Sequence, residues 1–184
     1  MTDTAIVGEN VEVIQTRGGA RSAFTWSVVI AGALAAWAVA FIFVALGSGI
    51  GLAIVTPYSG PTTTTMTIAG AIWLILSQTI AYAVAGYLAG RLRIRDHIPG
   101  PETKFRDAAH GFMAWVVGVG IMAAVVVLSA LLTAHTGAPT AADAADAARK
   151  AAAYASFWSF MALLFGAVAA TLAGILGGEL RDEI

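Results

Sequence analysis

Long apolar stretches separated by short polar segments dominate the sequence. A helix needs roughly 20 mainly apolar residues to cross about 30 Å of hydrocarbon, and four stretches of this chain reach that length. The pattern therefore predicts an all-α fold, a four-helix transmembrane bundle. The predicted spans cover residues 26–55, 68–92, 108–133 and 151–177. They form a transmembrane domain at 24–178, between an N-terminal tail at 1–23 and a C-terminal tail at 179–184.

The fourth helix is predicted to begin near residue 140, well before its span. Residues 139–154 are rich in Ala, the strongest helix former. Thr140 and Asp143 have the spacing of a helix-capping pair, and Asp146 and Lys150 are placed for an i, i+4 ion pair. We expect about two to three turns of this helix to lie outside the hydrocarbon, given a rise of about 1.5 Å per residue.

The positions of Lys and Arg predict the orientation of the spans, because cytoplasmic loops are enriched in both residues. Eight of the ten fall on one side of a four-span chain, in the two tails and in the joint between the second and third spans. These eight are Arg17, Arg21, Arg91, Arg93, Arg95, Lys104, Arg106 and Arg181. Only Arg149 and Lys150 lie on the other side. Both termini and the middle joint are therefore predicted to be cytoplasmic.

The two even-numbered spans end in the same pattern, G-x-L-x-G-x-L-R. It covers residues 86–93 and 174–181, which are 88 residues apart in the chain. The pattern suggests two tandem helical hairpins in parallel repeat, related by an axis along the membrane normal. Coincidence is the alternative, since Gly, Leu and Arg are all common where a membrane helix ends.

Small residues recur at helical spacing on every predicted span. Such faces let helix backbones approach closely in lipid, where the hydrophobic effect does not drive helix association. The predicted packing interface consists of Gly86, Gly90, Ala162, Gly166, Ala170, Gly174 and Gly178. Packing within one bundle requires such faces. Several spans carry two of them, however, which suggests association with a further helix.

Composition narrows the classes of function. The chain is 59% hydrophobic and 11% charged, with a mean hydropathy of +0.81, far from the composition of a soluble domain. A net charge of -1 gives no basic face for nucleic acid. The absence of Cys excludes disulfides and thiol chemistry. No catalytic, nucleotide-binding or metal-ligand motif is present, so we expect no catalytic residues, no cofactor and no metal.

A few polar residues remain as candidates for a site. Gln78, one turn from Tyr82, is the most polar position of the second span and is interpreted as an interhelical hydrogen-bonding group, with pore lining as the alternative. His110 lies one turn inside the third span and could pair with Asp107 or Glu179, or act as a proton-sensitive group. The arginines that follow the second span are expected to contact lipid headgroups; they are Arg91, Arg93 and Arg95.

The second span ends in G-x-L-x-G-R and the third opens with H-G-x-x-x-W. This combination resembles small bacterial inner-membrane proteins in general, a resemblance that implies no particular activity. It suggests a multi-pass protein of the bacterial inner membrane. The expected function is non-enzymatic: a structural or accessory subunit that self-associates or packs into a larger membrane complex. The alternative is a small oligomeric channel or transporter for an ion or small solute.

Overall fold

The computed structural model describes residues 24–54, 63–94, 100–134 and 142–183. These residues form four helices and, within the ranges given, no strand: α2 (Trp26–Ile54), α3 (Thr63–Arg91), α4 (Pro101–Ala134) and α5 (Ala142–Asp182). All four are long and apolar enough to cross a membrane. The predicted fold class is thereby confirmed, and the chain is a multi-pass membrane protein in contact with the bilayer.

The helices extend beyond the predicted spans mainly where polar residues continue them. α4 begins at Pro101, seven residues before the predicted span, because its start has the chemistry of a helix N-terminus. Gly100 adopts a left-handed backbone conformation (φ 99°), Pro101 follows it, and Glu102 lies in the first turn. α5 begins at Ala142, ten residues before its candidate span of Ala152–Asp182. The sequence predicted a start near residue 140, and residues 135–141 lie outside the described ranges.

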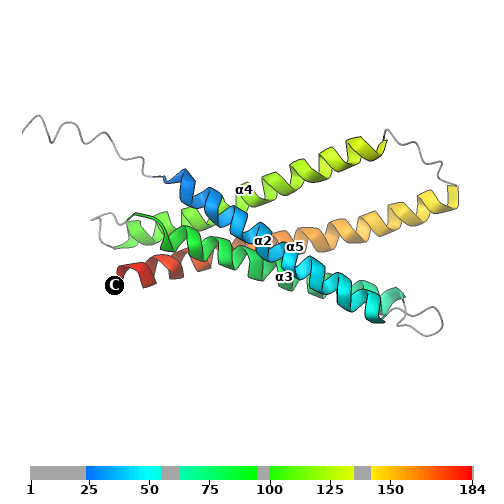
Figure 1. Ribbon diagram of the computed structural model, residues 1–184, viewed down its shortest axis with the longest axis horizontal. Coiled ribbons are helices and arrows are strands. Elements are labelled where there is room, and N and C mark those ends of the chain that lie inside the picture. Colours follow the sequence, from blue (N-terminus) through cyan, green and yellow to red (C-terminus); the bar gives the residue numbers. More distant parts are fainter. Residues whose placement is uncertain (1–23, 55–62, 95–99, 135–141, 184) are drawn as a thin grey trace, which may run out of the picture.

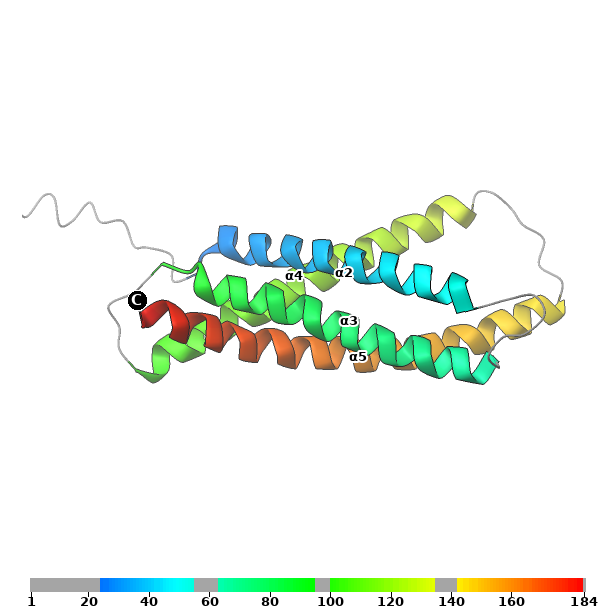
Figure 2. The same cartoon turned by 60° about the horizontal axis from the view of Figure 1, so that its bottom comes forward.

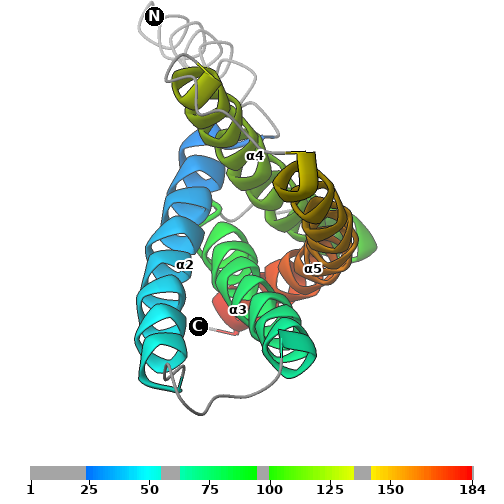
Figure 3. The ribbon, with the colours of Figure 1, turned by 90° about the vertical axis from the view of Figure 1, so that its right-hand side faces the viewer.

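α3 is the central helix of the bundle and contacts each of the other three (Figure 1). α4 also contacts all three, whereas α2 and α5 share no contact within the described ranges. Figure 2 shows α2 lying along α3, and the end-on view of Figure 3 shows α3 between α2 and α5. We call the end of the bundle where α3 and α5 finish, and where α2 and α4 begin, the arginine end.

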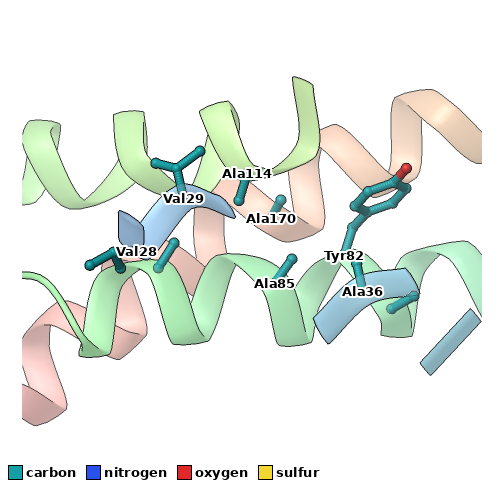
Figure 4. Close-up of a cluster of buried hydrophobic side chains, with 9 residues drawn as sticks. Val28, Val29, Ala36, Tyr82, Ala85, Ala114 and Ala170 are labelled. Atoms are coloured by element: carbon teal, nitrogen blue, oxygen red, sulfur yellow. The ribbon is translucent and has the colours of Figure 1, made fainter. Parts of the chain in front are cut away.

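Small side chains form the core. Apart from Tyr82, it consists of alanines and two valines (Figure 4). One face of α2 supplies Val28, Val29, Gly32 and Ala36 at helical spacing. A Cβ on Gly32 would lie 2.7 Å from the carbonyl oxygen of Ala85 in α3, which shows how closely the two backbones approach. The bundle is thus held by backbone proximity, as expected for helices in lipid.

The opposite end of the bundle is open. α4 leaves the other helices beyond Gly118, and its last turns project away from α2 and α3 (Figures 1 and 2). Every residue from Met122 to Leu132 is exposed. We call residues 120–132 the distal arm of α4.

Candidate functional site

Glycines form a tight seam between α3 and α5. A Cβ on Gly86 would collide with the backbone of Ala170, and one on Gly90 would collide with the backbone of Gly174. From the other side, a Cβ on Gly177 would meet the carbonyl oxygen of Tyr87. No side chain larger than hydrogen fits at these positions unless the helices separate.

α4 packs into the same seam. A Cβ on Gly174 would lie 2.6 Å from the carbonyl oxygen of Asp107, and one on Gly178 would collide with the Asp107 carboxylate. Gly111 in turn faces the carbonyl oxygen of Ala170. All seven residues of the predicted packing interface are buried in the chain's own helix contacts. Any association with another protein must therefore use other faces.

A buried carboxylate joins the ends of the two repeated patterns at the arginine end. Arg93 Nε donates to Asp107 Oδ1 at 2.6 Å, and the two side chains are each 2% exposed. Arg181 approaches the same carboxylate with Nη1 at 3.1 Å from Oδ1 and Nη2 at 3.3 Å from Oδ2. Arg181 also donates to the carbonyl oxygen of Gly90 at 3.0 Å and to Asp182 at 2.8 Å. We call Asp107, Arg93 and Arg181 the arginine latch.

The latch uses chemistry suited to low-polarity surroundings. A buried carboxylate is stable only if charge partners and hydrogen bonds replace its lost water, and two guanidinium groups supply both. Arg93 was expected at lipid headgroups, but it is turned inward instead, because Asp107 offers a charged partner inside the bundle. Arg91 is half-buried, and its Nη1 has no hydrogen-bond partner among the described residues. Arg95 lies outside the described residues.

His110 does not pair with Asp107 or Glu179. Its Nδ1 lies 2.7 Å from the carbonyl oxygen of Arg106, which can only accept, and its Nε2 lies 3.1 Å from the backbone N–H of Thr25, which can only donate. This arrangement requires the neutral ring with its proton on Nδ1. The ring also stacks on Phe24 at a centroid distance of 4.4 Å. His110 therefore fastens the start of α2 to α4.

Glu179 is on the surface and forms an ion pair with Lys104 at 2.7 Å. Both side chains are substantially exposed, so this pair contributes little to stability. It does link the start of α4 to the end of α5.

Gln78 lines a cavity of about 210 Å³ between α2, α3 and α4, which is open on the side of the exposed residues Phe41 and Met122. The lining residues are Ala36, Trp37, Ala40, Phe41, Val44, Gln78, Tyr82, Met122 and Val125. Trp37 Nε1 is already engaged, since it donates to the carbonyl oxygen of Gly118 at 3.3 Å. The Tyr82 ring is packed between Gly118 and Gly166, where added Cβ atoms would lie 2.9 Å and 2.7 Å from it.

Sequence reasoning did not foresee the arginine latch. The sequence features that could have indicated it are Arg93 and Arg181, which end the two repeated patterns, and Asp107, one turn before His110.

Within the described ranges, no group of three or more His, Cys, Asp or Glu side chains is arranged to hold a metal ion. The arginine latch, the hydrogen bonds of His110 and the glycine seam all join helices to one another. Comparisons with protein-family models, with curated proteins and with solved structures gave no match.

Proposed function

We propose that the protein is a non-enzymatic structural or accessory subunit of a membrane, which associates with itself or packs into a larger membrane complex. The distal arm of α4 is the observation that carries this proposal. In the most apolar 18 residues of each span, only 6% of the α4 residues are buried inside the bundle, against 28% in each of the other three spans. The arm is apolar on all sides, with Val126, Leu128 and Leu132 all more than half exposed.

The arm also has a face suited to a further helix. Gly120 and Ala124 lie one turn apart, and a Cβ on Gly120 would have no atom within 4 Å. A glycine inside a helix costs roughly 0.5–1 kcal/mol relative to alanine. At Gly86 or Gly174, close packing inside the chain offsets that cost. At Gly120 no described atom offsets that cost, and a helix that approaches from outside the chain would do so.

Orientation and location complete the proposal. The distribution of Lys and Arg supports cytoplasmic termini. The G-x-L-x-G-R and H-G-x-x-x-W patterns support a location in a bacterial inner membrane. The arginine end of the bundle would then face the cytoplasm. Single cysteines placed near Thr103 and near Lys150 should differ in labelling by a membrane-impermeant maleimide on intact cells, with only the second labelled. The reverse pattern would overturn this orientation.

The absence of Cys makes crosslinking a clean test of association. Ala124→Cys, on the small face of the distal arm, should form a disulfide-linked dimer in native membranes if the protein self-associates. Val168→Cys, at a lipid-facing position of α5, is the matched control and should remain monomeric.

If the protein instead belongs to a larger complex, Gly120→Leu should abolish co-purification of a stoichiometric partner. A monomer with neither dimer nor partner would refute the proposal.

A further inference from the structure

The cavity beside Gln78 lies at the centre of the predicted hydrocarbon layer. Gln78 is thirteen residues from each end of the α3 span, Thr65–Arg91. At about 1.5 Å per residue, it is about 20 Å from either end of that span. A side-chain amide at this depth has no bulk water to bond with, and leaving it unpaired is costly.

Nothing in the chain's described part satisfies this amide. Neither Gln78 nor Tyr82 makes a side-chain hydrogen bond to another described residue. The polar side chains nearby are engaged otherwise: Ser77 and Thr79 bond back to carbonyl oxygens of their own helix, and Trp37 bonds to Gly118. Gln78 is thus a hydrogen-bonding group presented to a cavity.

The remaining wall restricts what can occupy the cavity. It is apolar and partly aromatic, and no charged side chain lines it. Water requires two to four polar partners to be stable in such a space. Gln78 and Tyr82 supply the minimum for a single water, and the rest of the cavity of about 210 Å³ has an apolar wall that suits an apolar occupant. A charged ligand would pay the large cost of placing an ion at the bilayer centre.

The route of entry points to the bilayer itself. Met122 and Val125 belong to the distal arm of α4, where that helix leaves α2 and α3, and both are exposed. Phe41 and Val44 on the α2 side of the cavity are exposed as well. Figure 4 shows the inner boundary, where Tyr82 of α3 lies beside Ala36 of α2. A molecule dissolved in the hydrocarbon can enter between α2 and α4.

We propose that this cavity binds an uncharged lipophile whose head carries a carbonyl or hydroxyl oxygen, with the Gln78 amide as its hydrogen-bond partner. Aromatic and aliphatic side chains enclose the body of the ligand, and the amide fixes its orientation. This combination, an apolar pocket with few convergent polar groups, is typical of small-molecule sites. The inference does not depend on the proposed subunit function.

Benzophenone is a suitable probe, because it is an aromatic ketone that crosslinks to nearby C–H bonds under ultraviolet light. In bilayers containing the wild-type protein, labelling should saturate and map to the peptides around Met122 and Phe41. Diphenylmethane, which has a similar shape but no carbonyl, should compete more weakly than an unlabelled ketone. One neutral hydrogen bond corresponds to about a fivefold difference in affinity.

Variants separate the hydrogen bond from the apolar contacts. Gln78→Leu should weaken ketone binding by about fivefold and abolish the preference over diphenylmethane. Ser77→Ala, whose hydroxyl bonds to its own helix, is the matched control and should bind as the wild type does. Ala40→Leu should block labelling, because the larger side chain fills the cavity. The resistance of this variant to unfolding by detergent, compared with that of the wild type, shows whether its bundle is intact.

Three results would overturn the proposal. Labelling that is not saturable and is spread evenly over lipid-facing residues would show that no site exists. Equal competition by diphenylmethane would show that any apolar chain, including a lipid tail, fills the cavity. Unchanged ketone affinity in Gln78→Leu would show that the amide plays no part.

Discussion

Replacing Asp107 by Asn tests whether the arginine latch stabilises the bundle. The change removes one negative charge while keeping the size of a side chain that lies directly against Gly178. Arg93 and Arg181 would then be left as two buried cations without the carboxylate they share.

The magnitude follows from the environment of the two guanidinium groups. Removing one partner of a buried ion pair typically costs about 3–5 kcal/mol. Arg181 keeps its bonds to Asp182, which is 45% exposed, and to the carbonyl oxygen of Gly90. It therefore loses only part of its stabilising interactions. We therefore expect a decrease of about 3 kcal/mol in the free energy of unfolding, at the lower end of that range.

Unfolding by sodium dodecyl sulfate in mixed micelles, followed by far-ultraviolet circular dichroism, measures this loss. Glu179→Gln, which breaks only the exposed pair with Lys104, is the control and should match the wild type within error. A double-mutant cycle of Asp107→Asn with Arg93→Met should give a coupling energy above about 1 kcal/mol. If Asp107→Asn unfolds within about 0.5 kcal/mol of the wild type, the latch does not stabilise the bundle.

Three further predictions follow from the described contacts. Gly86→Val should prevent α3 and α5 from packing and abolish the cooperative unfolding transition, whereas Gly120→Val should leave the transition of the isolated protein unchanged; similar effects of the two would refute the assignment of the seam. Lowering the pH from about 7 to about 5 should lower the protection factor of the Thr25 amide, its exchange rate being compared with the intrinsic rate at the same pH, because protonated His110 loses its acceptor nitrogen and stability is lost as the pH falls; in His110→Phe this protection factor should no longer depend on pH. Arg91→Met should cost less stability than Arg93→Met, since Arg93 bonds to Asp107 and Arg91 does not, and equal losses in the same unfolding assay would contradict this.

The apolar pattern predicted the number and type of helices because burial in lipid leaves the backbone almost no alternative to helix. The helix limits were less predictable. Hydrophobicity reports where the hydrocarbon ends, whereas Pro101 and Glu102 begin α4 by capping chemistry that operates outside it.

The candidate site was less accessible to sequence reasoning. Glycines at helical spacing, such as Gly86 and Gly90, show that one face of a helix carries small side chains. They do not show whether the helix that packs on this face belongs to the same chain. Likewise, Arg93 and Arg181 meet at Asp107 only because α3, α4 and α5 cross at the arginine end. That crossing is a property of three helices packed together, so reading one span at a time could not reveal it.

The arginine latch has a consequence for the order in which the protein is made. Asp107 follows Arg93 by 14 residues, so the carboxylate can pair with Arg93 as soon as the middle joint and the start of α4 have been synthesised. Arg181 follows Asp107 by 74 residues and carries Asp182 with it as a second, charge-balanced pair. A chain whose synthesis stops before Arg181 would keep the glycine contacts between α5 and α4, but it would lack the ion pair that joins the end of α5 to Asp107.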